Sequence, residues 1–357
     1  MTLSIRIKER AINALLVGLV FLTTGIYSCF AQSAYSSVNY TDSNPASRVK
    51  NAGNKIRHVQ GINLQVEATP LQASINSAYH EIKPTLAPCG NRLYFSRVNH
   101  PLNTGGMTDQ EDIWYAAYDT LTQEWSEPIR MPGQLNTAGP NFVNNVSTSG
   151  DTIILGNRYL KNGKMKAGLS YSVNKRGQWS QPITISIQDD YNMSKHDNRY
   201  VSLKSGVIIS SVQRADTYGE RDLYVSFWNG TSGTIPVNMG GVINTEYEES
   251  SPFLADDLKT LYFASKGHNG YGGYDIFVTR RLDDSWTNWS EPENLGPAVN
   301  STLDDEFFSI SSCGGVATFS RQVNVHNVDL YKISMDDLFL QRKKKKNMES
   351  GSALASL

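Results

Sequence analysis

The stretch NTEYEESSPFLADDLKTLYFASKGHNGYGGYDIF, residues 244–277, contains the landmarks of a unit that recurs along this chain. It begins with Asn244, and an acidic residue, Glu249, follows five positions later. After the acidic residue come a short strand-like run, a turn, a second apolar run, and a third run that opens with Asp275. Runs rich in β-branched and aromatic residues, bounded by Gly, Asn, Asp and Ser, are typical of strands joined by tight turns. The unit therefore contains strands and no helix.

The same asparagine begins five units. Its copies are spaced by 60, 56, 52 and 56 residues and are Asn76, Asn136, Asn192, Asn244 and Asn300. A period in this range is typical of propellers and solenoids. A four-stranded sheet of this size cannot bury both faces alone, but radial packing against its neighbours buries them and leaves only short edges. The sequence therefore predicts an all-β fold, a five-bladed β-propeller of four-stranded antiparallel blades.

The ring needs a closure, because the fifth unit lacks a fourth strand. In three other units that strand is marked by the sequences Trp125–Pro128, Trp179–Pro182 and Trp289–Pro292. The run Ile62–Pro70 alternates with period two and lies just ahead of the first Asn, so we expect it to complete the last blade. Six blades would require a further unit, and residues 33–60 are too polar to supply one.

The N-terminal residues are typical of a secretory signal peptide. Basic residues precede the apolar stretch Ala11–Ile26, and residues 29–31 offer small side chains at a cleavage position. We predict cleavage after Ala31 and export, to the periplasm or to an outer-membrane-associated location. The chain then divides into a signal peptide (1–31), a flexible Ser- and Asn-rich lead-in (32–60), the propeller (61–338) and a basic disordered tail (339–357).

Two alternatives for the N-terminus remain open. An uncleaved membrane anchor would use an apolar span that is barely long enough and is interrupted by Asn13 and the Thr23–Thr24 pair. In the other alternative Cys29 is a lipidated first residue, although Ile26–Ser28 matches the usual small-residue pattern poorly. The remaining cysteines, Cys89 and Cys313, are expected to be free, with a disulfide between neighbouring blades as the alternative.

Charge excludes one class of partner. The 33 basic residues nearly balance the 34 acidic ones, so no basic face for nucleic acid is implied. The run Arg342–Lys346 is interpreted as part of a solvated tail; weak contact with anionic lipid is the alternative, at ~1 kcal/mol per basic residue. No metal-type cysteine spacing occurs, and we predict no cofactor.

Candidate binding residues occupy the acidic position of each unit, where the innermost strand should begin. They are Glu81, Asn141, Asp197, Glu249 and Asp305. If these groups converge at the mouth of an axial channel, two carboxylates 4 Å apart would repel by about 4 kcal/mol at an effective dielectric constant near 20. Such repulsion would favour a bound cation or a basic partner. In the alternative, each carboxylate caps backbone N–H groups of its own blade, and the recurrence of the residue favours this role.

A basic residue also recurs, 21 or 22 positions after each Asn. The five are Arg97, Arg158, Arg214, Lys266 and Arg321. We expect each to pair with the Asp that opens the third strand. Unit two has Gly168 in place of that Asp, so Arg158 is a candidate for contacting a ligand, with a solvated side chain as the alternative.

Residues Glu249–Asp257, Leu261–Lys266 and Gly273–Phe277 resemble the WD-repeat-like propeller repeat of the TolB family. The resemblance extends more loosely over residues 62–335. The same residues are also similar to the propeller part of envelope proteins that carry an OmpA-like domain. It implies an interaction module of the periplasm or outer membrane without known catalysis. Too few residues follow the fifth unit for an OmpA-like domain, so we do not expect peptidoglycan anchoring.

The function that we predict is therefore non-catalytic binding or scaffolding, by a monomer, of an envelope protein or cell-wall component. A carbohydrate-binding or glycoside-processing propeller is the alternative, and it would need two or three non-repeated carboxylates converging in one funnel. No Gly-x-Ser-x-Gly elbow is present to support Ser/His/Asp hydrolysis. A fold of this kind does not decide between these functions, because function depends on the site.

Overall fold

The computed structural model describes residues 55–311 and 314–339. The predicted signal peptide, Cys29, Cys313, the basic run Arg342–Lys346 and the lead-in before residue 55 lie outside the described residues, as does the side chain of Cys89. Signal cleavage, lipidation, tail contacts and the Cys89–Cys313 alternative therefore stay predictions. Among the described residues, no helix has the length and apolar character needed to cross a membrane.

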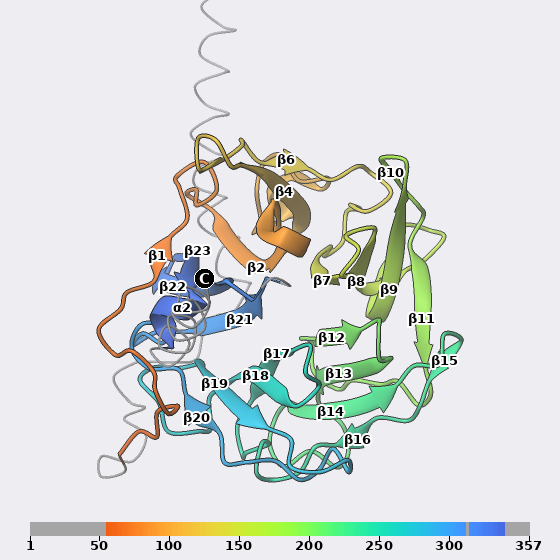
Figure 1. Cartoon of the computed structure of the whole chain (residues 1–357). Coiled ribbons are helices and arrows are strands. Elements are labelled where there is room, and N and C mark those ends of the chain that lie inside the picture. Colours follow the sequence, from red (N-terminus) through yellow and green to blue (C-terminus); the bar gives the residue numbers. More distant parts are fainter. Residues whose placement is uncertain (1–54, 312–313, 340–357) are drawn as a thin grey trace, which may run out of the picture. The chain divides into compact units, whose positions relative to one another are not determined.

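Five antiparallel sheets stand around a common centre, which confirms the predicted five-bladed propeller (Figure 1). Blade one contains β2 (His80–Leu86), β3 (Arg92–Val98), β4 (Asp112–Asp119) and β6 (Ile129–Arg130), with β5 (Glu124–Trp125) beside β4. Blade two contains β7 (Val143–Val146), β8 (Thr152–Tyr159), β9 (Met165–Lys175) and β11 (Ile183–Ile187), with β10 (Gln178–Trp179) beside β9. Blade three contains β12 (Asn198–Ser202), β13 (Val207–Val212), β14 (Asp222–Phe227) and β16 (Val237–Asn238); β15 (Ser232–Gly233) pairs with β11 of blade two.

The last two blades follow the same order. Blade four contains β17 (Glu249–Leu254), β18 (Thr260–Ser265), β19 (Asp275–Arg280) and β20 (Glu293–Asn294). Blade five contains β21 (Asp305–Ile310), β22 (Val316–Asn324) and β23 (Asn327–Ser334), and its fourth strand is β1 (Thr69–Pro70). The short helix α2 (Met335–Leu338) follows β23.

The N-terminal segment closes the ring as predicted, although only the last two residues of the run Ile62–Pro70 form the strand. Thr69 pairs with Lys332 and Pro70 with Tyr331, so a strand from before the first unit completes the last blade. The innermost strand of blade one also contacts blade five, because the Lys83 N–H donates to Ser320 Oγ of β22 at 3.2 Å. Residues ahead of β1 also contact the propeller: the Val59 N–H donates to the carbonyl of Asn294.

The apolar core is divided into five clusters, one between each pair of neighbouring sheets. Alternation along a strand sends side chains to both sides. In β18, Leu261 and Phe263 pack against blade three, while Tyr262 packs against blade five. The closing junction is filled in the same way, with Leu330 of blade five packed among the apolar residues of blade one. Each sheet therefore buries both faces, which is what the repeat required.

The repeated asparagine connects the loop that follows one blade to that blade's third strand. In four units its side chain accepts from the N–H and donates to the C=O of the same third-strand residue. The pairs are Asn76–Leu330, Asn136–Ile113, Asn244–Leu223 and Asn300–Ile276. Asn192 differs, because it contacts Ser194, His196 and Gln213 within its own loops. The side-chain amide thus satisfies the N–H and C=O of a third-strand residue, as a residue of a neighbouring strand would.

The Trp-Ser-Glu/Gln-Pro sequences do not form the fourth strand themselves. Trp125 lies in β5 and pairs back onto β4, and the fourth strand begins only after Pro128. The motif serine extends the ladder, since Ser126 Oγ accepts from the Ala117 N–H. Proline lacks an N–H, so it suits the residue just before an edge strand.

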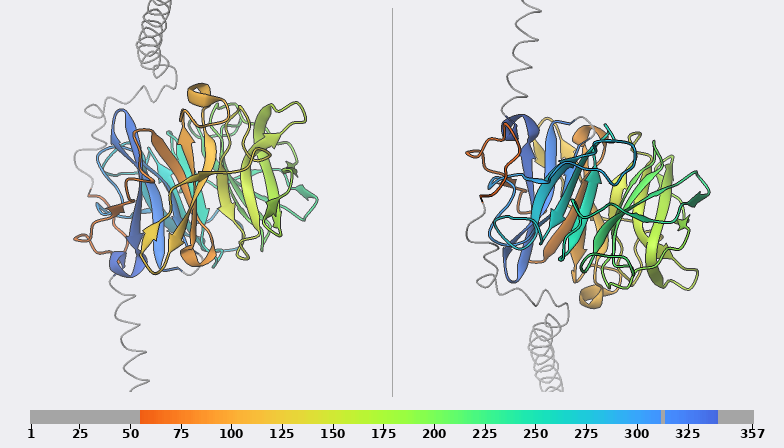
Figure 2. Two further views of the ribbon diagram at one scale, coloured as in Figure 1. Left: turned by 90° about the horizontal axis from the view of Figure 1, so that it is seen from above. Right: turned by 90° about the horizontal axis from the view of Figure 1, so that it is seen from below.

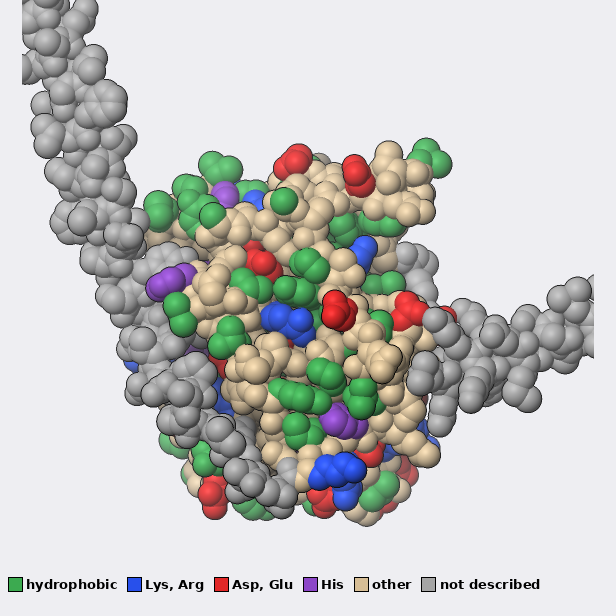
Figure 3. Space-filling view, turned by 90° about the vertical axis from the view of Figure 1, so that its left-hand side faces the viewer, with side chains coloured by type: hydrophobic (Ala, Val, Ile, Leu, Met, Phe, Trp, Pro, Cys, Tyr) green, Lys and Arg blue, Asp and Glu red, His purple; other side chains and the backbone are tan. Residues whose placement is uncertain are grey.

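The two faces of the ring carry different loops. In edge-on views the strands cross the thickness of the ring, so successive loops alternate between faces (Figure 2). We define the entry face as the face carrying the loops that lead into the innermost strands, together with the loops joining second to third strands. The opposite face carries the turns between first and second strands. On the side of the ring turned to the viewer in Figure 3, basic, acidic and apolar side chains are interspersed.

Candidate functional site

A small cavity lies at the centre of the ring and is lined by all five innermost strands. We call it the inner-strand cavity; its volume of about 40 Å³ holds about three water molecules. Its lining residues are Lys83, Pro84, Thr85, Val143, Asn144, Asn198, Arg199, Tyr200, Ser251, Pro252, Phe253, Phe307, Phe308 and Ser309. The side-chain nitrogen of Asn144 is buried there without a hydrogen-bond partner among the described residues. Asn144 therefore places beside the cavity a donor that no described residue satisfies.

Three innermost strands carry the same irregularity beside this cavity. Each has a β-bulge two residues after its acidic position, in β2, β17 and β21. The residues at the bulges are Lys83, Ser251 and Phe307, with φ of 57°, 50° and 57°. None is glycine, so each left-handed conformation costs about 1–3 kcal/mol and must be held by its surroundings. Bulges of this kind re-aim side chains, and they occur often beside functional sites.

The predicted acidic residues are held within their own blades. Glu81, Asn141, Glu249 and Asp305 are completely buried. Each accepts from the backbone N–H of the residue that follows the repeated Asn. These donors are Ser77, Thr137, Thr245 and Ser301. Asp197 instead pairs with Arg199. These contacts match the capping alternative, and a binding role for the five residues stays a prediction.

Glu249 lacks a basic partner among its hydrogen bonds, so its burial has a measurable consequence. Its carboxylate accepts from Thr245 N–H, Thr245 Oγ1 and Ser265 Oγ. Burial raises the pKa of Glu249 to about 7. Because the pKa in the folded state lies above that in the unfolded state, the stabilisation is complete below about pH 4.5 and is lost as pH rises through 7.

We therefore expect Glu249→Gln to reduce the pH dependence of stability. Wild type should gain about 2 kcal/mol between pH 8 and pH 5 relative to the variant, following the linkage of one proton. The free energy of unfolding from urea titrations at the two pH values checks this. Asn141 shows that an amide fits this position in blade two. Equal pH dependence of the two proteins would contradict the assignment to Glu249.

The prediction that the repeated basic residue pairs with the third-strand Asp is wrong. Arg97 pairs with Glu81, and Arg321 with Asp305, both on the first strand. The third-strand Asp is already used by its own loop: Asp112 accepts from the N–H of Thr104, Asp222 from Tyr218, and Asp275 from Tyr271. Register places Glu81 opposite Arg97 and Asp305 opposite Arg321, so the base meets the acid of the first strand.

Arg158 is the exception that the sequence indicated. It makes no ion pair among the described residues, and its Nε donates to the Ala167 carbonyl. Gly168 leaves the space for this contact, since a Cβ there would lie 2.8 Å from Arg158 Nε. The side chain is half-buried. Contact of Arg158 with a ligand stays a prediction.

A buried charged network lies on the entry face of blades three and four. Arg221 donates to Glu248 at 3.0 Å and to the hydroxyl of Tyr274 at 2.7 Å. Glu248 also accepts from Lys266 at 2.7 Å. Burial favours the neutral acid, but the charges of Arg221 and Lys266 outweigh it and hold the pKa of Glu248 well below its usual range. Glu248 is therefore an ionised hydrogen-bond acceptor.

Glu306 extends this network from blade five. One oxygen accepts from Ser250 Oγ at 3.0 Å and from Ser251 Oγ at 3.2 Å. Burial and the neighbouring charge of Asp304 raise the pKa of Glu306. The side chain of Asn198 donates to Ser250, so blades three, four and five are joined beside the inner-strand cavity.

The remaining charged residues approach from blades one and three. Lys83 makes a two-oxygen contact with Glu111, at 2.7 and 2.9 Å, and lies 3.6 Å from the ring centre of Phe142. Arg199 is held between Asp190 and Asp197. Partial burial, followed by the charges of Arg221, Lys83 and Lys266, lowers the pKa of His196, and the charge of Glu248 opposes this shift. Charges from blades one, three and four therefore act on one point of the entry face.

Sequence reasoning missed Lys83, Arg199 and Arg221. The signal that could have found Lys83 and Arg199 is a basic residue two positions after the acidic position, where the other units have Val143, Ser251 and Phe307. Arg221 directly precedes the third-strand Asp, where the other units have no basic residue. A residue whose type differs from those at the same position of the other units is a candidate for a role other than packing the blades.

Among the comparisons with known proteins, the likeness to BT0996 supports the fold. No protein-family model matches the sequence, and no characterised protein matches it in a sequence comparison. The RGII complex of BT0996 is similar in structure at 9% identity, over 77% of this chain and 92% of that protein, with a TM-score of 0.52. TolB from Acinetobacter baumannii is 13% identical over 74% of this chain, which spans 54% of TolB, with a TM-score of 0.43. α-L-arabinofuranosidase from Lactobacillus brevis is 12% identical over 75% of this chain and 94% of that enzyme, with a TM-score of 0.45.

Proposed function

We propose that this propeller is a non-catalytic binding protein of the cell envelope whose ligand, an envelope protein or cell-wall component, docks at the entry face over the inner-strand cavity. The observation that carries the proposal is the convergence of non-repeated charged residues there, each held by a partner from another strand or loop. Lys83 is held by Glu111, and Arg221 by Glu248 and Tyr274. Fixed donors and acceptors of both signs suit a polar partner, because little ordering is left to occur on binding.

The paired state of these carboxylates favours binding over acid catalysis. A general acid works with a pKa near the operating pH, whereas Glu248 is held ionised by two cations. The strained backbone at Ser251 and Phe307 supports the same site, since the cost of that strain is justified by the side chains it places beside the cavity. The signal-peptide pattern of residues 1–31 supports an exported location.

The experiment uses one substitution in the cavity and one on the opposite face. Asn144→Leu replaces the unpartnered amide with an apolar side chain of similar size, and Asn91→Leu makes the same change in the exposed turn between β2 and β3. The probes are a detergent-solubilised envelope protein fraction and enzymatically solubilised cell-wall fragments, applied to immobilised protein. We expect Asn144→Leu to weaken capture about tenfold, as for the loss of ~1.4 kcal/mol, and Asn91→Leu to leave it unchanged. Equal capture by both variants would contradict the proposal.

A second function, glycoside processing, is favoured by one observation. Glu306 has a raised pKa, it accepts only from hydroxyls among the described residues, and its side chain is partly accessible to solvent. Those are properties of a general acid. If a screen of plant and bacterial glycans shows hydrolysis, Glu306→Gln should abolish it; hydrolysis that survives the substitution excludes Glu306 from the chemistry.

A further inference from the structure

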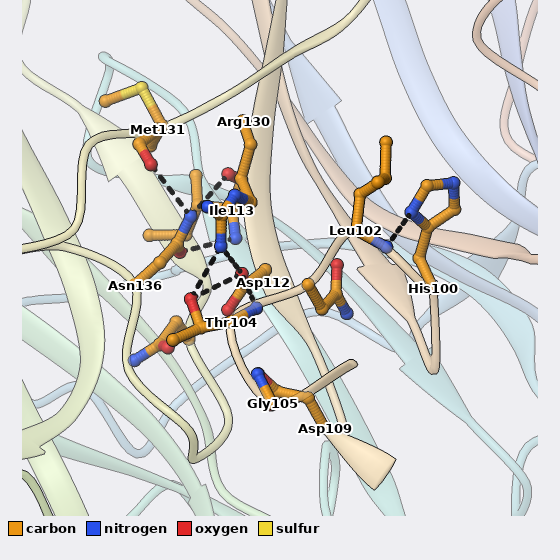
Figure 4. Close-up of polar contacts among 12 residues, drawn as sticks. His100, Leu102, Thr104, Gly105, Asp109, Asp112, Ile113, Arg130, Met131 and Asn136 are labelled. Carbon is orange, nitrogen blue, oxygen red and sulfur yellow. Dashed lines mark hydrogen bonds and ion pairs between the residues drawn. The ribbon is translucent and has the colours of Figure 1, made fainter. Parts of the chain in front are cut away.

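Two buried aspartates meet in the loop that joins β3 to β4 of blade one. Asp109 is 1% exposed and Asp112 is completely buried. The Oδ2 atom of each carboxyl group accepts hydrogen bonds: Asp109 Oδ2 accepts from the Gly105 N–H, and Asp112 Oδ2 accepts from the Thr104 N–H and hydroxyl (Figure 4). The other oxygen of each, Oδ1, is buried without a partner from any donor group among the described residues.

The two carboxyl groups are neighbours, because their Oδ2 atoms accept from the N–H groups of consecutive residues, Thr104 and Gly105. A carboxylate is only an acceptor, so a hydrogen bond between the two groups requires that one of them carries a proton. Two ionised carboxylates side by side in a buried site would repel, and like-charged pairs of this kind commonly hold one proton between them. We propose that Asp109 and Asp112 share a proton that closes the loop 99–111 at acidic pH, and that loss of this proton loosens the loop at neutral pH.

The charged groups around the pair do not remove the need for the proton. Arg130 of β6 contacts Asp112 Oδ2 at 3.3 Å, but its side chain is 40% exposed and it also donates to Thr104. Glu111 is occupied by Lys83, and Arg97 of β3 by Glu81. Tyr159 of β8 stays neutral, because burial raises its pKa. Burial and the charge of Arg97 lower the pKa of His100 to about 4, so the imidazole is uncharged above pH 5.

The sign of the pH effect follows from the direction of the shift. Burial and the charge of Asp112 raise the pKa of Asp109 to about 6, above its ordinary value of 3.8. The closed loop is therefore most stable below about pH 4, and this stabilisation is lost as pH rises through 6. For one proton with these values, the ratio of closed to open loop falls about tenfold between pH 5 and pH 7.5.

The loop is connected to the inner-strand cavity through Glu111. The Glu111 carbonyl accepts from the Asn141 N–H of blade two at 2.8 Å, and its carboxylate holds Lys83. Loosening of the loop would thus free the Lys83 ammonium to meet a ligand at neutral pH. This consequence rests on the proposed function, whereas the loop equilibrium does not.

Hydrogen exchange measured by mass spectrometry tests the proposal without any ligand. At pH 5 and pH 7.5, the exchange of residues 99–111 is compared after correction for intrinsic rates. We expect about tenfold less protection at pH 7.5 in wild type. In Asp109→Asn the amide donates to Asp112 and accepts from Gly105 at every pH, so protection should not change with pH. Asp216→Asn is the matched control, because Asp216 lies in the equivalent loop of blade three with its side chain 63% exposed.

Three outcomes would overturn the shared proton. One is equal protection of the wild-type loop at both pH values, and another is unchanged pH dependence in Asp109→Asn. The third is recovery of full protection at pH 7.5 on adding calcium chloride and its loss with a chelator, which would show that the pair holds a cation instead. Loss of ligand capture with a normal loop equilibrium would count against the proposed function alone.

Discussion

Arg221→Ala should destabilise the protein by about 3 kcal/mol, one of the two largest effects that we expect from a single substitution. Arg221 is 4% exposed and donates to Glu248 and Tyr274, which come from different loops. Removing one member of a buried ion pair leaves the remaining charge desolvated, which costs about 3–5 kcal/mol; Lys266 still contacts Glu248, so we expect the lower end. Urea unfolding monitored by circular dichroism measures the loss.

Arg280→Ala is the matched control for this experiment. Its side chain is 65% exposed and lies 3.9 Å from Asp257. Exposed ion pairs contribute about 0–1 kcal/mol, so stability should hardly change. A loss in Arg221→Ala no larger than in the control would mean that the network on the entry face is solvated rather than buried.

Asn300→Ala should cost about 3 kcal/mol as well. The side chain is 1% exposed, accepts from the Ile276 N–H at 2.7 Å and donates to the Ile276 carbonyl at 2.9 Å. It also donates to the side chain of Asn294 at 2.8 Å. Alanine leaves buried backbone groups of β19 unsatisfied, each costing about 1–3 kcal/mol. The free energy of unfolding in urea is again the measurement.

Asn192→Ala tests whether the effect comes from the third-strand contact. Asn192 occupies the same position of the repeat, but its partners lie in surface loops that water can reach. We expect a loss of about 1 kcal/mol. If both substitutions cost the same, the repeated asparagine stabilises its own loop rather than the ladder.

The repeat made the architecture predictable because each copy has the same local task. The spacing of the asparagines gave the number of blades, and the missing fourth strand of the fifth unit indicated closure by the run before Asn76, which β1 confirms. The recurrence of the acidic residue also indicated its capping role. These features depend on contacts within one unit or between consecutive units.

The binding surface was much less predictable, because its side chains come from loops and strands that share no local sequence pattern. Arg221 precedes β14, yet its partners are Glu248 and Tyr274, and Lys83 is held by Glu111 across a whole hairpin. No local pattern reports which of these side chains meet, since ring closure and the bulges decide it. The same reason explains the wrong partner predicted for Arg97: register places Asp112 opposite it, but the loop had already used that carboxylate.

The proposed binding site and the proposed loop equilibrium share residues. Glu306 and Glu248 give the entry face its fixed acceptors, and Lys83 supplies a cation whose partner, Glu111, belongs to the loop with the paired aspartates. If both proposals hold, the protein presents a different charge over its cavity under acidic and neutral conditions.

The most direct measurement is a hydrogen-exchange footprint of the mature protein with and without a ligand captured from the envelope fraction or the cell-wall fragments. If the ligand docks over the inner-strand cavity, protection will increase at residues 81–85, 196–200, 248–252 and 304–308, on several blades at once. Protection confined to the turns of the opposite face, such as residues 88–91 and 255–259, would contradict the proposed site.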